Sequence, residues 1–264
     1  MPSVPDPQPA STSTARWIRP GLAAGAIVAA LALSACGGDD EEPTASTATP
    51  TATAPAATSA PDARLAVKLD PEQVGTEQRP QAVRIAVDLR MAPTVPDDQM
   101  PPVEAVELEI PPGVLFRPDE LEACAPEKLE DQGPTGCPKA SRIGSGTVGA
   151  HAGTIDVEGK ATAVYGGDDR VLLWVSIVNP VSVGAAISGR LESQPAGGYR
   201  LALRVPADLQ EVAGIPVALS RMRVTLGRGG ALATTTCPDG GLPFAARLAL
   251  GDVASEANAI ATCR

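Results

Sequence analysis

The residue types that most often perform acid–base chemistry are sparse in this chain. His151 is the only histidine among 264 residues, and a serine or cysteine nucleophile usually needs a histidine as its base. Only glycine and alanine flank it within residues 149–153, and the G-x-S-x-G signature of many hydrolases is absent. The sequence therefore favours a histidine on a strand or turn, and one histidine is too few for a histidine-based metal site.

Pairs of carboxylates are the next candidates, because two of them can hydrolyse a glycosidic bond. Glu107 and Glu109 share the polar face of an alternating segment, and the acids of residues 119–122 lie where a short helix is expected. Asp168 and Asp169 occupy a glycine-rich turn that lacks the ordered ligand spacing of a calcium loop. We interpret all of these as surface acids and expect no catalytic residue, no metal and no cofactor.

The glycines of residues 144–149, GSGTVG, match the pattern G-x-G-x-x-G. A dinucleotide-binding fingerprint must end a strand and open a helix, so that the helix N-terminus meets the pyrophosphate. The following residues, AHAGTIDVEG, are typical of strands and turns. The glycines are therefore expected to allow a close backbone approach or a bulge within a sheet.

The start of the chain has the pattern of an export signal. Arg16 and Arg19 precede the uncharged run GLAAGAIVAALALSA, residues 21–35. A positive segment followed by about 7–15 apolar residues that end in small ones is typical of a secretory signal, whereas a membrane-spanning helix needs roughly 20 apolar residues. We expect residues 1–35 to be a signal peptide that is removed.

That run ends in Leu33-Ser34-Ala35-Cys36, which resembles the lipobox of bacterial lipoproteins. In that family a diacylglyceryl group is attached to the cysteine thiol, and cleavage leaves the cysteine as the mature N-terminus. The resemblance implies that Cys36 is acylated and that membrane lipid is its partner. Because two or more acyl chains anchor a protein stably, it also implies a lipid-anchored position on the extracytoplasmic side of the cell membrane.

Residues 36–62 have the composition of a disordered tether. Two glycines and four acids follow Cys36, and residues 43–62 contain no Val, Ile, Leu, aromatic or basic residue. Such a segment cannot bury enough apolar surface to offset the entropy of ordering. As a flexible coil it would span on the order of 30 Å.

The remaining four cysteines, Cys124, Cys137, Cys237 and Cys263, favour disulfides in an exported domain. Three pairings are possible, and we prefer Cys124 with Cys137 and Cys237 with Cys263. These pairs close the shortest loops, and each brackets a turn-rich segment with few apolar residues. A four-thiolate zinc site is the rival interpretation, but its ligands usually come in close pairs such as C-x-x-C, which the sequence lacks.

The charge of the chain argues against nucleic acid as a partner. The formal net charge is −10 at pH 7, and removal of residues 1–35 would take away two arginines and only one acid. Nucleic-acid-binding proteins usually carry a basic surface. The sequence therefore fits an exposed domain whose partner, besides membrane lipid, would be a cell-envelope protein or glycan.

The rest of the chain, residues 63–264, is dominated by a period of two. Apolar residues alternate with polar ones in segments 83–89, 106–110, 199–205, 222–226 and 244–250. This alternation predicts strands with one buried face, and the doubly apolar VLLWVSIV of residues 171–178 predicts a central strand. Residues 117–131 alone look helical, and Pro126 splits them. We therefore predict an all-β domain, an antiparallel β-sandwich of Ig-like or jelly-roll-like type.

Two longer stretches carry a further resemblance. IPPGVLFRPDELEACAPEKLEDQGPTGCPKASRIGSGTV and TTTCPDGGLPFAARLAL, with ATCR at the end of the chain, look like β-rich modules in exported proteins of high-GC Gram-positive bacteria. The resemblance implies fold and location, and it supports the local cysteine pairing, but it implies no activity.

These observations lead to one main functional hypothesis and two alternatives. The main hypothesis is a non-catalytic binding or structural module that is presented outside the membrane on a tether. The first alternative is an exported hydrolase that uses His151 or a carboxylate pair. The second is recognition of cell-wall glycan, for which Tyr165 or Tyr199 would have to be exposed beside a groove, while Trp174 is expected in the core.

Overall fold

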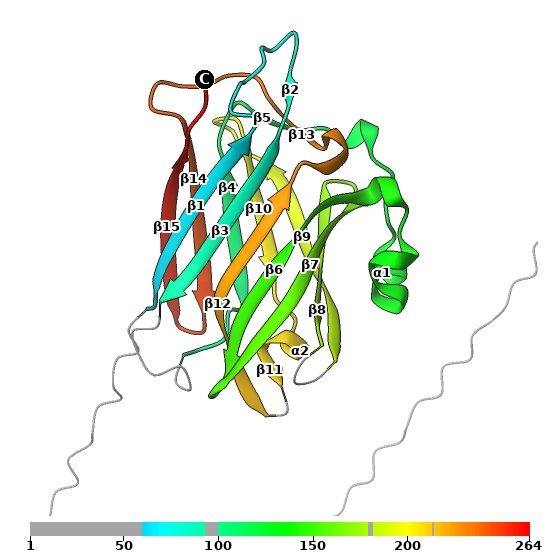
Figure 1. The fold of residues 1–264 in the computed structure, drawn as a ribbon, viewed down its shortest axis with the longest axis vertical. Coiled ribbons are helices and arrows are strands. Elements are labelled where there is room, and N and C mark those ends of the chain that lie inside the picture. Colours follow the sequence, from blue (N-terminus) through cyan, green and yellow to red (C-terminus); the bar gives the residue numbers. More distant parts are fainter. Residues whose placement is uncertain (1–59, 93–99, 179–181, 213) are drawn as a thin grey trace, which may run out of the picture. The chain divides into compact units, whose positions relative to one another are not determined.

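The computed structural model describes residues 60–92, 100–178, 182–212 and 214–264 (Figure 1). The predicted signal peptide, Cys36 and nearly all of the predicted tether lie outside these residues. The main strands are β1 (Asp62–Asp70), β3 (Arg84–Ala92), β4 (Ala105–Ile110), β6 (Arg142–Ala152), β7 (Ile155–Gly167), β8 (Arg170–Ile177), β9 (Val183–Ser193), β10 (Tyr199–Arg204), β12 (Ile215–Leu226), β14 (Leu242–Leu250) and β15 (Val253–Ala261). The short strands are β2 (Gln81–Ala82), β5 (Val114–Phe116), β11 (Glu211–Val212) and β13 (Leu232–Thr234), and the α-helices are α1 (Pro126–Gln132) and α2 (Ala207–Gln210).

The main strands form one continuous antiparallel sheet in the order β1-β3-β12-β6-β7-β8-β9-β10-β4-β14-β15, and β11 extends it beside β12. The two edge strands, β1 and β15, lie side by side (Figure 1). Near them the backbone N–H of Val74 donates to the carbonyl of Arg264, and the N–H of Arg264 donates to the carbonyl of Glu72, both at 3.0 Å. The sheet is therefore curled into a nearly closed barrel.

The predicted all-β antiparallel class is confirmed, but the sandwich is replaced by this barrel-like sheet. Strands β6 to β10 pair in sequence order as a meander, and the eleven main strands belong to one hydrogen-bonded sheet and not to two packed sheets. An alternating pattern shows that one face of each strand is buried, and it does not show in which order the strands pair.

The alternating segments face the barrel interior as their pattern predicts. In β3, for example, Ile85, Val87 and Leu89 are buried, and the residues between them face outward. Strand β8 lies in the middle of the strand order and is apolar on both faces, because Leu173 faces the interior while Leu172 belongs to a second cluster on the outer wall. The predicted central strand is confirmed.

The second cluster lies beneath α1 on the outside of the barrel. Leu129 of α1 is fully buried there with Cys124, Cys137 and Val164. Pro126 opens this helix, which a proline can do because the first helical N–H has no partner within the helix. The predicted helical segment is thus confirmed as two short pieces, since the other piece is a 3₁₀ turn, Pro118–Glu120.

Both preferred disulfides are confirmed. Cys124 is bonded to Cys137 with their Cα atoms 5.2 Å apart, and Cys237 is bonded to Cys263 with 5.8 Å between the Cα atoms. The first closes the loop that carries α1 on the outer wall. The second joins the segment before β14 to the C-terminal residues.

The antiparallel register gives the barrel two distinct ends. At the Gly153 end lie the β6–β7 turn at Gly153, the β14–β15 turn at Gly251 and the short helix α2. Strand β1 also begins at this end, where Asp62 pairs with Ala92, the last residue of β3. At the small-sheet end lie β2, β13 and β5, which form a separate three-stranded sheet. In Figure 1 the Gly153 end is at the bottom and the small-sheet end is at the top.

The glycine pattern of residues 144–149 lies within β6, as predicted, and serves close backbone approach. A Cβ on Gly146 would collide with the carbonyl oxygen of Arg223 on β12, whereas a Cβ on Gly149 would lie 3.3 Å from the Ser220 hydroxyl. The distance between β6 and β12 at this position is therefore compatible only with glycine at residue 146.

We expect Gly146→Ala to lower the free energy of unfolding by about 2 kcal/mol, because β12 must move away from β6 to admit the methyl group. Urea denaturation followed by circular dichroism measures the change. Gly149→Ala is the matched control on the same strand and should cost clearly less. Equal losses in the two variants would contradict the close-approach explanation.

Candidate functional site

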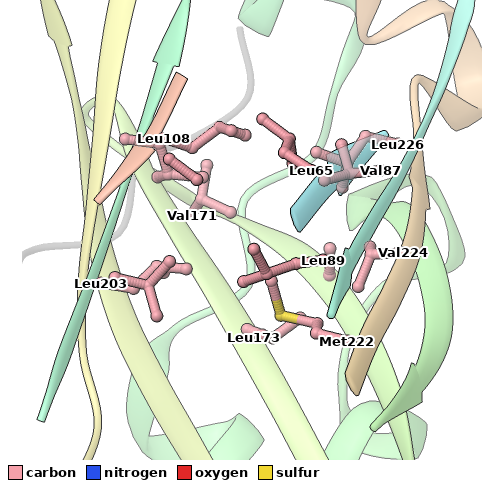
Figure 2. A pocket seen from close by; sticks show the side chains of 14 residues that line it. Leu65, Val87, Leu89, Leu108, Val171, Leu173, Leu203, Met222, Val224 and Leu226 are labelled. Carbon is pink, nitrogen blue, oxygen red and sulfur yellow. The ribbon is translucent and has the colours of Figure 1, made fainter. Parts of the chain in front are cut away.

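An apolar cavity of about 50 Å³ lies in the middle of the barrel. Its lining side chains are Leu, Val, Ala and Met only, and they come from β1, β3, β4, β7, β8, β10, β12 and β14. Figure 2 shows Leu89, Leu173 and Met222 around the centre of this space, with Leu203 beyond it. The cavity therefore contains no side-chain group that could hydrogen-bond a polar molecule.

Two further apolar cavities continue this one along the barrel. A cavity of about 30 Å³ shares Leu201 and Leu226 with it and extends to the small-sheet end. A cavity of about 90 Å³ shares Leu203 and Met222 with it and extends to Leu209 of α2 at the Gly153 end. The central cavity thus shares lining side chains with each of the other two.

The width of the sheet and the small interior side chains explain why these spaces exist. An eight-stranded barrel is just wide enough for side chains to fill, and additional strands widen the interior. Here eleven strands follow one another around the path, while interior positions of β6 and β7 hold residues as small as Gly144, Ala161 and Ala163. Aromatic residues, which could fill the gap, make up only 2% of the chain.

Empty apolar space lowers the stability of a fold. At about 24 cal/mol per Å³, the cavity of about 90 Å³ costs roughly 2 kcal/mol. Apolar cavities of this kind stay dry and can bind apolar molecules. An apolar molecule that filled this space would recover part of that free energy.

The outer wall carries a charged cluster of Asp88, Arg90, Arg221 and Arg223. Arg221 donates to both carboxylate oxygens of Asp88, from Nε at 3.0 Å and from Nη2 at 2.5 Å, and Arg223 donates from Nη2 at 3.3 Å. Arg90 donates from Nη2 at 3.3 Å. The hydrogen bonds from Arg221 hold the pKa of the Asp88 carboxyl well below its usual range, against the opposing effect of burial. The cluster joins β3 to β12.

A wide hollow of about 810 Å³ adjoins this cluster on the outer wall. Its floor contains glycine and threonine, and its charged groups have both signs: Arg221, Arg223 and Lys160 face Asp156 and Glu158. The mixture gives the hollow no single charge that would select an anion or a cation.

The structure places His151 on the outer wall, away from the cavities. Its Nδ1 lies 2.8 Å from Oδ1 of Asp156, across the β6–β7 hairpin, and the Asp156 side chain is 85% exposed. Within the described residues no serine or cysteine side chain forms a hydrogen bond with His151. The residues needed for a nucleophile and its base are therefore not brought together there.

The candidate carboxylates also lie on the surface, as predicted. Glu107 and Glu109 face outward from β4 beside Arg247, whose pKa is raised mainly by its hydrogen bond to Glu256 and further by these two glutamates. Asp168 and Asp169 form the β7–β8 turn with positive φ angles. No paired carboxylates enter the barrel in the part of the chain that the structure describes.

Within the described residues, the aromatic side chains do not form an exposed platform of the kind that glycan recognition would use. Tyr165 packs edge-on against Phe116 with the ring centroids 5.7 Å apart, and burial raises its pKa, as do Asp169, Asp168 and Asp119. Tyr199 is half-buried, and its hydroxyl accepts a hydrogen bond from the Phe116 N–H at 3.5 Å. Trp174 is half-buried against the outer cluster and not in the barrel interior.

Sequence reasoning missed the interior cavities. The available signal was the combination of many aliphatic strands, small residues at interior positions of residues 144–163 and very few aromatic residues.

Among the described residues, no group of three or more His, Cys, Asp or Glu side chains is placed to hold a metal ion. None of the helices in that part of the chain has the length and apolar character needed to cross a membrane.

The fold and the site together define an all-β, nearly closed barrel with an aliphatic interior that is not completely filled. A scan against protein-family models finds no match to the chain, and a search of the curated proteins finds none.

Proposed function

We propose that this protein is an exported lipoprotein, held on the extracytoplasmic side of the cell membrane through acylated Cys36, whose barrel is a non-catalytic binding module for an apolar ligand. The export signal of residues 1–35 and the lipobox Leu33-Ser34-Ala35-Cys36 support the location. The two disulfides support it further, because disulfides persist in oxidising compartments.

The line of apolar cavities along the barrel is the observation that carries the binding function. The three cavities follow one another from Leu209 at the Gly153 end to Leu232 at the small-sheet end. They are narrow and lined almost wholly by aliphatic side chains, so they fit an alkyl chain better than a ring system or a polar molecule. The ligand class is therefore a molecule with a linear hydrocarbon chain.

Filling the central cavity tests this function. Ala246 is buried on the inner face of β14 and lines the cavity, while Ala245 next to it faces outward. We expect the protein to bind cis-parinaric acid, a fluorescent probe with a linear hydrocarbon chain, saturably, with displacement by dodecanol. Ala246→Leu should weaken this binding at least about tenfold, a difference of about 1.4 kcal/mol, because the added carbons occupy the ligand space.

Ala245→Leu is the matched control and should bind the probe like the unchanged protein. Urea denaturation shows whether Ala246→Leu is folded, and filling a void should keep or raise its free energy of unfolding. Saturable binding that is equal in all three proteins, or no saturable binding in the unchanged protein, would overturn the proposed function.

A further inference from the structure

Exposed aliphatic side chains gather at the Gly153 end of the barrel. Ile155, Val178 and Ile215 are 44%, 76% and 40% exposed, and Ile155 and Ile215 begin β7 and β12, the two strands that flank β6. Ile215 is close to the β6–β7 turn, since its Cγ2 lies 3.8 Å from the position of a Cβ on Gly153. We call these three residues the apolar rim. Single exposed aliphatic residues are ordinary, whereas a group of them marks an interaction surface.

The chain enters the barrel at this same end. Strand β1 begins at Asp62, and the residues before it lead back to the expected anchor at Cys36. The tether that composition predicts for residues 36–62 would reach on the order of 30 Å. The small-sheet end is farther from the anchor by the nine residues of β1, which is roughly 30 Å of strand. A short attachment therefore favours contact between the Gly153 end and the membrane.

The largest of the three cavities extends toward this end as well. It lies between Leu209 of α2 and Val217 and Leu219 of β12. Strand β12 thus carries the rim residue Ile215 and, a few residues farther along, side chains that line the cavity. Exposed apolar surface and internal apolar space are continuous along one strand.

We propose that the Gly153 end docks on the lipid bilayer, with the apolar rim inserted among the lipids, and that the barrel takes up the alkyl chain of a membrane lipid there. This inference rests on the proposed function. The occupant of the surface is the bilayer itself, because the tether ends there and the rim is apolar. Acidic residues at this end, among them Asp156, Asp208 and Glu211, favour a zwitterionic lipid over a strongly anionic one.

Fluorescence quenching tests the docking. The full chain with its anchor is reconstituted into phosphatidylcholine vesicles whose acyl chains carry bromine, a quencher of tryptophan. Ile155→Trp should lose most of its added emission in these vesicles. Asp239→Trp, exposed before β14 at the small-sheet end, should lose almost none. Equal quenching at the two residues would overturn the docking.

Transfer of cis-parinaric acid from phosphatidylcholine vesicles to the reconstituted protein tests uptake. Ile155→Asp combined with Ile215→Asp should slow transfer several-fold, while Ile260→Asp should leave the rate unchanged. Ile260 is the matched control, since it is 67% exposed on β15 at the small-sheet end.

Binding of cis-parinaric acid in solution separates the two proposals. If the rim variants bind this probe normally but transfer slowly, the inference is supported. If they bind and transfer as the unchanged protein does, the membrane inference fails while the proposed function stands. If the unchanged protein does not bind the probe at all, the proposed function fails.

Discussion

Replacing Cys36 with serine should remove the lipid from the protein and abolish its stable attachment to the membrane. A hydroxyl cannot replace the thiol as the site of thioether-linked acylation. Each methylene of an acyl chain that enters the bilayer contributes about 0.8 kcal/mol, so losing two or more chains removes nearly all of the affinity for the membrane. The folded domain should be unaffected, because Cys36 precedes β1 by a long segment.

Mass spectrometry of the N-terminal peptide, together with membrane fractionation, measures this change. The unchanged protein should yield a peptide that begins at Cys36 and carries the mass of the acyl groups, and Cys36→Ser should yield none. The mass also distinguishes attachment through lipid from attachment through an uncleaved leader. Gly38→Ser, two residues away, is the control and should remain acylated. A native protein in the cytosol with its leader intact and its thiols reduced would contradict the assignment.

The strands could be predicted from the sequence because each is specified locally. A strand with one buried face alternates in sequence, as Ile85, Val87 and Leu89 do, and a strand covered on both sides is apolar throughout, as in β8. Pro126 marked the division of the helical segment for an equally local reason, since proline lacks the N–H that an interior helical position needs, and α1 begins at this residue.

Closure of the sheet could not be predicted in the same way, because it depends on pairs of strands that are far apart in the sequence. Strand β12 lies between β3 and β6, and β4 lies between β10 and β14. The ion pairs between Asp88 and Arg221 that join β3 to β12 connect residues 133 positions apart. No local pattern distinguishes these partners from the other alternating strands.

The cavities were still harder to predict, because a void forms where the side chains of several strands together leave space unfilled. Ala163 of β7 and Ala246 of β14 face the same space, although each by itself is an ordinary small residue on an alternating strand. Composition supplied only the indirect sign that few aromatic residues were available for the core. The outer wall, where His151 is half-buried and Asp156 is exposed, was easier to predict because polar residues on the outer face of a strand can remain in contact with water.

The disulfide between Cys124 and Cys137 should hold the outer cluster closed, and its removal should open that cluster before the barrel unfolds. Helix α1 has only seven residues, too few to be stable without support from packing. Without the bond, the loop depends on contacts such as the burial of Leu129. We expect Cys124→Ser combined with Cys137→Ser to lower the free energy of unfolding of this region by about 3 kcal/mol.

Trp174 reports on this opening, because it is the only tryptophan of the described residues and lies under the loop, about 3.5 Å from the position of a Cβ on Gly133. In urea, its emission should shift to longer wavelength at a lower concentration than the one at which the strand signal in circular dichroism is lost.

Removing the other disulfide gives the contrasting result and so tests the explanation. Cys263 lies beside Arg264, whose backbone bonds to Glu72 and Val74 where the two edges of the sheet meet. Removing the Cys237–Cys263 disulfide, by Cys237→Ser with Cys263→Ser, should loosen the closure of the barrel itself. The fluorescence and circular dichroism transitions should therefore move together to a lower urea concentration. If the two double variants behaved alike, the outer cluster would not be a separate unit of local unfolding.

A separate outer unit would mean that the loop with α1 can vary without disturbing the cavities, because the second cluster shares no buried residue with the barrel core.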